Sequence, residues 1–229
     1  MLLSIGTRFI DGFDFHLFME AQAATDVFSQ WALMGKDEGM EKGHYPSVKA
    51  MLELALQKVT NDFTAIDLGC GNGWVTRMLT ELGASHSEGV DGALEMINKA
   101  TEIDSSHLYS HGLLPEWKPN RRFDLVHTME FLYYLEDPVE MISIIHDQWL
   151  EEGGVLVAGI DHYLEHKESL TWPEHVGVHM TTMSIAQWTD AMKKAGFTNI
   201  EIHQVAAKDD FPGTLVMLGQ ASRPQAHTV

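Results

Sequence analysis

The sequence contains little cysteine, few basic side chains and no long apolar run. Its 229 residues include one cysteine, Cys70, so an intramolecular disulfide is impossible, which favours a reducing compartment. No stretch approaches the roughly 20 apolar residues that a membrane-spanning helix needs. The first residues also lack the basic and then apolar pattern of a secretory signal. We therefore expect a cytoplasmic protein without a membrane segment.

Basic residues are scarce, because 15 Lys and Arg stand against 33 Asp and Glu, for a formal net charge of −18. Nucleic acids are bound through clusters of Lys and Arg that contact phosphates. The chain offers only the pairs Arg121-Arg122 and Lys193-Lys194, so a nucleic-acid substrate is disfavoured. The acidic excess serves either solubility or the steering of a cationic substrate.

Length and composition fit one α/β domain with a covering layer, because 45% of the residues are hydrophobic and 21% are charged. Residues 1–45 are irregular and aromatic, and we expect them to form an N-terminal cap. Residues 46–220 are expected to form the main domain, with a lid insertion at 161–183. Residues 221–229 are expected to be a disordered tail.

Short apolar runs alternate with helical patterns from residue 64 onward, which indicates a parallel sheet with helices on both faces. Strands are expected at residues 64–68, 86–90, 107–110, 123–128 and 155–160, and helices at 74–82, 93–100 and 139–149. Ser184 with Gln187 predicts a capping box, and residues 200–205 and 214–219 predict a closing hairpin. The expected fold is a doubly wound, mostly parallel seven-stranded α/β sheet with a small helical and loop cap.

The region before this sheet is expected to contain a flexible loop at residues 35–39, because glycines flank charged residues there. Pro46 is expected to open a helix, since proline suits the first helical position and apolar residues recur behind it at helical spacing.

A glycine-rich segment from Asp67 to Gly73, with the sequence DLGCGNG, lies where the first strand runs into a helix. Glycines there permit a tight turn and let a ligand lie against the backbone. The second strand ends at Asp91, whose carboxylate is suited to accept hydrogen bonds from both hydroxyls of a ribose. A helix N-cap is the structural alternative for Asp91.

The glycine spacing distinguishes between two nucleoside cofactors. The dinucleotide fingerprint G-x-G-x-x-G would place its last glycine at Trp74, whereas the third glycine here is Gly73. Asp67 would repel a pyrophosphate but suits a ligand that carries an ammonium group. S-adenosylmethionine has a ribose, an ammonium group and no phosphate, so these residues fit it better than NAD.

Four motifs in order resemble those of the class I S-adenosylmethionine-dependent methyltransferases, over roughly residues 46–220. They are the loop at 67–73, Gly89-Val-Asp91, the fourth-strand segment at 123–138 and the turn at 150–154. The resemblance implies a Rossmann-like fold, S-adenosylmethionine as cofactor and methyl transfer as the reaction.

By this resemblance, Asp67 and the loop glycines would line the methionine end of the cofactor, Asp91 the ribose, and Thr128 and Met129 the region of the sulfonium. Many relatives have an Asp at the adenine, where this chain has His111. The expected cofactor-binding residues are Asp67, Gly69, Cys70, Gly71, Asn72, Gly73, Asp91, Gly92, His111, Gly112, Leu113, Thr128 and Met129.

The acceptor site is expected beside the sulfonium, formed by Glu130, Tyr133 and His162, with Trp31 and Tyr163 as walls. Ligands of doubly wound sheets bind outside the carboxyl ends of the strands, where the first three of these residues lie. A carboxylate beside aromatic faces suits an amine acceptor. The structural alternatives are that Glu130 anchors the chain and that the tyrosines are core residues.

His162, Glu165 and His166 match H-x-x-E-H, a spacing that on a helix presents two ligands to zinc. A zinc protease conflicts with the upstream motifs, so no metal site is expected, although a structural or orienting metal stays open. We expect residues 28–45 and 161–183 to close over the ligand.

The expected function is methylation of a small molecule by a monomer or homodimer. The alternatives are a protein or RNA methyltransferase and a catalytically silent protein that binds the same cofactor.

Overall fold

The structure is a computed structural model that describes residues 21–222. The parts of the sequence-based interpretation that fall on residues 1–20 and 223–229 therefore lie outside the described residues. The strands are β1 (Thr64–Leu68), β2 (His86–Asp91), β3 (Leu108–His111), β4 (Phe123–Met129), β5 (Leu150–Ile160), β6 (Thr198–Val205) and β7 (Thr214–Gln220).

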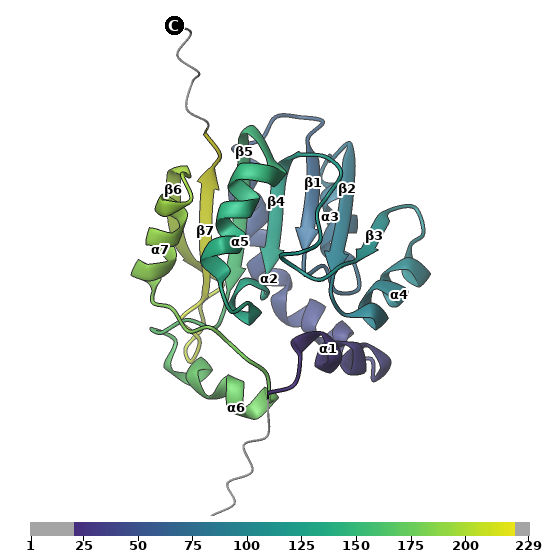
Figure 1. The fold of residues 1–229 in the computed structure, drawn as a ribbon, viewed down its shortest axis with the longest axis vertical. Coiled ribbons are helices and arrows are strands. Elements are labelled where there is room, and N and C mark those ends of the chain that lie inside the picture. Colours follow the sequence, from purple (N-terminus) through teal and green to yellow (C-terminus); the bar gives the residue numbers. More distant parts are fainter. Residues whose placement is uncertain (1–20, 223–229) are drawn as a thin grey trace, which may run out of the picture.

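These strands form one sheet in the order β3-β2-β1-β4-β5-β7-β6 (Figure 1). The first five are parallel to their neighbours, whereas β7 runs antiparallel to both β5 and β6. The order reverses between β1 and β4, which is where doubly wound sheets bind their ligands. The expected seven-stranded, mostly parallel fold with a closing hairpin is therefore confirmed.

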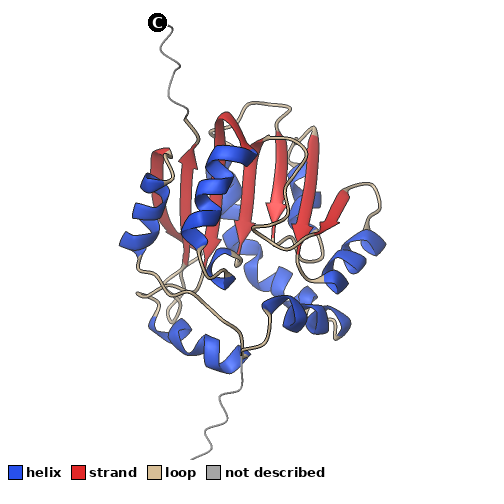
Figure 2. Ribbon diagram, in the orientation of Figure 1, coloured by secondary structure: helices blue, strands red, loops and turns tan. Residues whose placement is uncertain are grey.

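The helices are α1 (Ala24–Leu33), α2 (Asp37–Ala55), α3 (Trp74–Glu81), α4 (Leu94–Ile103), α5 (Pro138–Ile144), α6 (Trp172–Val176) and α7 (Ile185–Lys194). Short 3-10 helices at Leu132–Tyr134 and Lys167–Thr171 and a π-helical turn at Ile145–Trp149 complete the elements. Helices α5 and α7 cover one face of the sheet, and α2 and α3 cover the other (Figures 1 and 2). The expected capping box at Ser184 and Gln187 is present at the start of α7.

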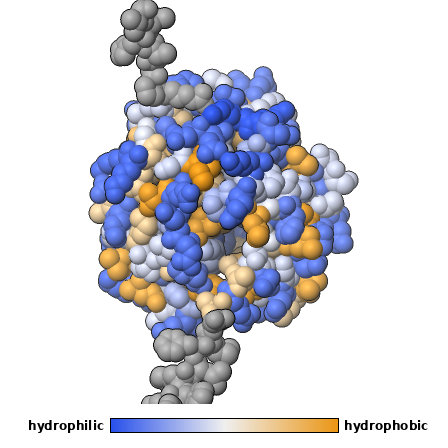
Figure 3. Space-filling view, in the orientation of Figure 1, coloured by the Kyte–Doolittle hydropathy of each residue, from blue (hydrophilic) through white to orange (hydrophobic). Residues whose placement is uncertain are grey.

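Alternation along the strands explains these two layers. In β1, Ile66 and Leu68 belong to the core cluster that includes α5 and α7, whereas Ala65 packs with α2 and α3. Successive side chains of a strand point to opposite faces, so a strand buried on both faces is apolar throughout. Hydrophilic residues cover most of the face seen in Figure 3, with smaller hydrophobic patches between them.

Helix α2 begins at Asp37, so the prediction that Pro46 opens this helix is wrong. Gly39, expected in a loop, also lies inside α2, although Gly35 does make the turn after α1, at φ 72°. Glycine and proline have low helix propensity, which is why the sequence suggested a loop. The buried Asp37 accepts hydrogen bonds from Asn72 (2.9 Å) and Lys99 (2.6 Å), and these tertiary contacts fix the start of the helix.

Helices α1 and α6 lie along the edge of the sheet where the parallel strands end (Figure 1). Helix α6 belongs to the segment between β5 and α7, and α1 contacts α4. Among the described residues, no helix is both long enough and apolar enough to cross a membrane.

Candidate functional site

The glycine loop after β1 has a backbone that only glycine adopts without strain. Gly69, Gly71 and Gly73 have φ values of 68°, 53° and 78°. A Cβ atom on Gly73 would lie 2.4 Å from the ring of Tyr109, and one on Gly69 would lie 2.9 Å from Phe131. The loop therefore brings bare backbone to the carboxyl ends of β1 and β2.

A cavity of about 300 Å³ lies beside this loop. Besides the loop and the strand ends, Phe28 of α1 and Met40 and His44 of α2 line it. Most of the predicted cofactor-binding residues also line it, namely Asp67, Gly69, Cys70, Gly71, Asn72, Asp91, Gly92, Gly112, Leu113 and Met129.

Three of the predicted cofactor residues do not line this cavity. Gly73 is the N-cap of α3, behind the loop. The Thr128 hydroxyl donates to the carbonyl of Leu68 (3.0 Å), so it joins β4 to β1. His111 is exposed, with its Nε2 atom 3.1 Å from the carbonyl of Gly92. These residues support the site from outside.

Asp91 is held by two backbone groups at the end of β2. Its Oδ2 atom accepts from the N–H of Gly71 (2.8 Å), and Oδ1 accepts from the N–H of Ala93 (2.7 Å). The N-cap of α4 is Ala93, so Asp91 is not that helix cap. Burial raises the pKa of Asp91, although both N–H groups and His111 act in the opposite direction. Each oxygen keeps a further lone pair for a ligand.

Asp67 pairs with His127, its neighbour in the parallel register of β1 and β4. The Nδ1 atom of His127 lies 2.7 Å from Oδ1 of Asp67, and both side chains are buried at the cavity. Because a carboxylate only accepts, Nδ1 donates, and Nε2 of a neutral ring is left as an acceptor. This Nε2 atom has no hydrogen-bond partner among the described residues. The pair therefore offers acceptors for an ammonium group.

His44 of α2 also lines the cavity, together with Glu130, Phe131 and Tyr134, which follow β4. Glu130 leaves β4 in the left-handed region, at φ 55°, and accepts hydrogen bonds from the Tyr133 hydroxyl (2.7 Å) and from the backbone N–H of Asp161. Burial raises the pKa of Glu130 well above its usual range, and the nearby charge of Asp161 adds to this effect. Burial therefore disfavours the charged form of Glu130, and a positive charge nearby would act in the opposite direction.

The other residues predicted for the acceptor site lie outside the cavity lining. Tyr133 is buried and reaches the site through its hydroxyl, as given above. His162 is fully buried, with Nδ1 3.0 Å from the carbonyl of Ser169 and Nε2 2.8 Å from the Thr182 hydroxyl. Trp31 packs on Phe28.

The insertion adds no residue to the lining of the cavity. Tyr163 is buried and donates to the carbonyl of Gly213 (2.9 Å). None of residues 161–183 lines the cavity, so α1 and α2 provide its cover, and a lid role for the insertion stays a prediction.

The H-x-x-E-H segment does not bring its three side chains to one point. Glu165 accepts from the N–H of Ile185 at the start of α7 (3.0 Å), and Nδ1 of His166 lies 2.6 Å from the carbonyl of Asp161. With His162 engaged as described, all three side chains have structural partners.

The sequence did not point to several polar residues of the site, among them Asp37, His44, His127 and Asp161. The signal for His127 was the pairing of strands that flank the switch point, and the signal for Asp161 was its place directly after β5. Asp37 and His44 carried no signal, because both lie in the stretch expected to be irregular.

Comparisons with known proteins agree with this geometry. The family described as methyltransferase domain matches residues 21–202. The chain is 29% identical over 152 residues to trans-aconitate 2-methyltransferase of Agrobacterium fabrum, which covers 66% of this chain and 55% of that protein. It is 37% identical over 105 residues to tRNA U34 carboxymethyltransferase of Shewanella woodyi, which covers 42% of this chain and 31% of that protein. The chain thus spans about half, or less, of these relatives' length.

Among solved structures, a methyltransferase in complex with the Trm112 activator of Haloferax volcanii aligns with a TM-score of 0.76 at 27% identity. The alignment covers 86% of this chain and 98% of that one. The DhpI complex with S-adenosylhomocysteine aligns with a TM-score of 0.66 at 18% identity, covering 88% and 97%, and shows the shared fold. The resemblance that the sequence motifs suggested is confirmed: the chain belongs to the methyltransferase-domain family, the class I S-adenosylmethionine-dependent methyltransferases with a Rossmann-like fold.

Proposed function

We propose that this protein transfers the methyl group of S-adenosylmethionine to a small molecule bound in the cavity between the glycine loop and α2. The observation that carries the proposal is the continuity of this cavity. Gly71 and Asp91 of the loop and strand β2 line the same cavity as His44 and Glu130. A cofactor and an acceptor would therefore meet inside one covered space.

Each part of the cofactor has a suitable partner in the cavity. Asp91 is placed to accept from the ribose hydroxyls, and Asp67 with His127 to accept from the ammonium group. Gly112 and Leu113 follow β3 and offer backbone and apolar surface to the adenine. Under this assignment the sulfonium points toward Met129 and Glu130.

The reaction needs alignment more than acid–base chemistry. A nucleophilic atom of the acceptor attacks the methyl carbon in line, the carbon–sulfur bond breaks, and its electron pair stays on sulfur. Because the sulfonium already activates the methyl group, the protein contributes positioning and the exclusion of water. Phe28, Phe131 and Tyr134 supply apolar walls for both tasks.

The amine acceptor expected from the sequence requires a charged Glu130. Burial and Asp161 raise the pKa of Glu130 well above its usual range, which favours the neutral form. The proposal of a small-molecule acceptor does not depend on an amine.

Polymer substrates are the alternative, because relatives are named as acting on tRNA and on protein arginine. Against RNA stands the net charge of −18, which opposes contact with phosphates. Against both stands the cover of α1 and α2 over the cavity, which leaves a polymer less access than a small molecule.

Radiolabelled cofactor tests the proposal. The purified protein is incubated with methyl-labelled S-adenosylmethionine and, separately, with a small-metabolite extract, a proteome and an RNA pool. Label in the metabolite extract alone is expected. Label in protein or RNA alone, or in no pool, contradicts the proposal.

The free edge of the sheet favours a protein partner. Ile103 of α4, Leu108 of β3 and Leu113 are large apolar residues with about half of their surface exposed. Among the strands of residues 21–222, β3 has a neighbour on one side only. Since the Haloferax volcanii relative is complexed with Trm112, we propose that an activator of this kind binds the β3 edge. Co-purification with Haloferax volcanii Trm112 that Leu108→Asp abolishes is expected. Absence of a complex, or a complex that the variant leaves intact, contradicts it.

A further inference from the structure

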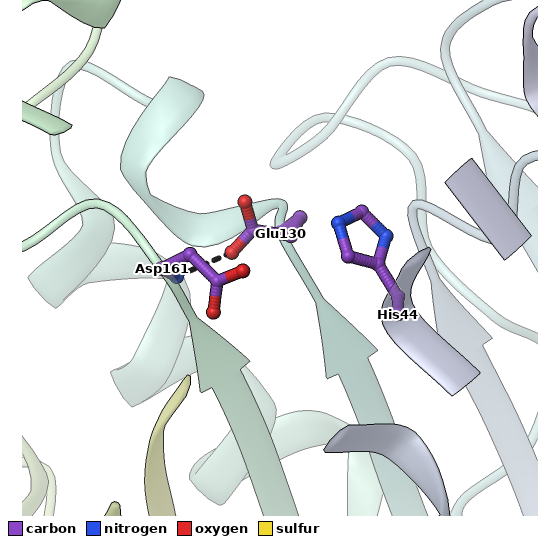
Figure 4. A group of neighbouring side chains, drawn as sticks. All are labelled: His44, Glu130 and Asp161. Atoms are coloured by element: carbon purple, nitrogen blue, oxygen red, sulfur yellow. Dashed lines mark hydrogen bonds between the residues drawn. The ribbon is translucent and has the colours of Figure 1, made fainter. Parts of the chain in front are cut away.

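Three side chains with metal-binding atoms meet at the acceptor end of the cavity. His44 comes from α2, Glu130 follows β4, and Asp161 follows β5 (Figure 4). One nitrogen or oxygen atom from each residue lies within 4.8 Å of the others. Among residues 21–222, no other group of three or more His, Cys, Asp or Glu side chains has that spacing. The three elements therefore place one imidazole and two carboxylates around one point.

Neighbouring groups hold both carboxylates in place. Glu130 accepts from the hydroxyl of Tyr133 (2.7 Å) and from the backbone N–H of Asp161, and Thr214 of β7 donates to Oδ1 of Asp161 (2.6 Å). Outer hydrogen bonds of this kind orient metal ligands and are part of a metal site. They leave Oδ2 of Asp161 and further lone pairs on Glu130 available.

The ring of His44 is not engaged elsewhere. It makes no hydrogen bond with any described residue, and Figure 4 shows it facing the two carboxylates across the space between them. A neutral imidazole offers a lone pair rather than a charge, which is the form that binds a metal.

Lys and Arg side chains do not neutralise this group. Within the described part of the chain, neither Glu130 nor Asp161 forms an ion pair with Lys or Arg. Two carboxylates at one partly buried point repel each other, and a cation held between them relieves this repulsion. The imidazole of His44 beside them supplies a third ligand atom for such a cation.

We propose that His44, Glu130 and Asp161 bind a divalent transition-metal ion of the Zn²⁺ class at the acceptor end of the cavity. One imidazole and two carboxylates form a ligand set for such ions, and three protein ligands leave positions open for water or substrate. His44 and Glu130 line the cavity, so the open positions face it. This departs from the sequence-based expectation, which included no metal site.

The ion gives the acceptor class a chemical definition, which rests on the proposed function. An acceptor that binds the ion does so through oxygen, as a carboxylate or a hydroxyl group. A metal-bound hydroxyl loses its proton to water more readily. The resulting oxygen forms the bond to the methyl carbon while the carbon–sulfur bond breaks toward sulfur.

Calorimetry with Zn²⁺ on chelator-treated protein tests the ion site without any turnover. We expect one Zn²⁺ per chain, and affinity lower by about a hundredfold or more in His44→Ala and in Asp161→Asn. His203→Ala is the matched control, because His203 pairs with Glu201 at the surface (3.2 Å) and should not change the affinity. Loss of binding in His203→Ala, or wild-type binding no tighter than that of the two site variants, overturns the ion site.

Binding of S-adenosylhomocysteine to the same proteins separates this inference from the proposed function. We expect unchanged affinity in all four proteins, because none of the substituted residues is among those assigned to the ribose or the ammonium group of the cofactor. If Zn²⁺ binds as expected but methyl transfer is equal with and without it, the role of the ion in acceptor binding is overturned. If the metabolite extract takes no label while Zn²⁺ binds, the proposed function fails and the ion site stands.

Discussion

The Oδ2 atom of Asp91 accepts a hydrogen bond from the backbone N–H of Gly71 across 2.8 Å. This contact joins the end of β2 to the glycine loop after β1, and Oδ1 is fixed in the same way by Ala93 (2.7 Å). The two parts of the proposed cofactor site are thus aligned before any ligand arrives. Preorganisation of this kind reduces the cost of binding.

Replacement of Asp91 should weaken cofactor binding. Asp91→Ala removes both the acceptors for the ribose and the anchor of the loop, so we expect S-adenosylhomocysteine affinity to fall by about 1–3 kcal/mol. Calorimetry measures this directly. Asp190→Ala is the control, because the Asp190 side chain is largely exposed on α7. Equal affinity in Asp91→Ala and wild type would show that Asp91 has no part in binding.

Glycine substitutions should separate a required glycine from a permissive one. In Gly73→Ala the new Cβ would clash with the Tyr109 ring, and alanine would have to adopt a φ of 78°. We therefore expect a loss of about 1–3 kcal/mol in the free energy of unfolding. Gly39→Ala lies inside α2 with no atom within 4 Å, and should gain about 0.5–1 kcal/mol. Urea unfolding measures both. The account of the loop fails if Gly73→Ala is as stable as wild type.

The stabilisation from Asp37 should depend on pH. Burial acts to raise the pKa of Asp37, but hydrogen bonds from Lys99 and Asn72 outweigh it, so the pKa lies below its usual value. At a pH between the pKa of Asp37 in the folded state and its usual pKa, the folded state binds fewer protons than the unfolded state. The contribution is therefore complete above about pH 4 and is lost as the pH falls through the folded pKa.

Asp37→Asn exposes this dependence. We expect the variant to be about 1–3 kcal/mol less stable than wild type near neutral pH. The difference should shrink as the pH falls below about 4. Urea unfolding at both pH values measures it. A difference that stays constant or grows toward acid would contradict the role given to Asp37.

Ligand binding should protect the cover of the cavity. Phe28 of α1 and Met40 and His44 of α2 line it, so amides in residues 28–45 should exchange more slowly with S-adenosylhomocysteine bound. Residues 161–183 contribute no lining residue and should change little. Hydrogen exchange with mass spectrometry resolves the two segments. Slower exchange in residues 161–183 with unchanged exchange in residues 28–45 would instead support the insertion as the lid.

The sequence predicts the part of the cavity at the glycine loop better than the part at His44 and Glu130. The loop from Asp67 to Gly73 and the acid at Asp91 are visible because a tight turn and a close ligand require particular residues at fixed spacing. The sheet is also predicted from the sequence, because alternating strands and helices are compatible with few topologies.

The acceptor end was hidden for two physical reasons. Gly39, Gly43 and Pro46 have low helix propensity, so the sequence does not predict the first half of α2, where His44 lies. The helix forms there because tertiary hydrogen bonds at Asp37 outweigh this local propensity. Directly after β5, successive side chains point in different directions. Asp161 therefore faces His44, whereas the next residue, His162, faces Ser169. The apolar pattern of a strand does not show at which residue the strand ends.

Under the proposed function, one cavity holds the cofactor at the glycine loop and the acceptor at His44 and Glu130. The direct test measures S-adenosylhomocysteine affinity and methyl transfer to the labelled metabolite fraction in wild type, Glu130→Gln and His44→Ala. We expect both variants to keep the cofactor affinity and to lose transfer by roughly a hundredfold or more. Transfer at the wild-type rate in both variants would place the acceptor elsewhere and contradict the account.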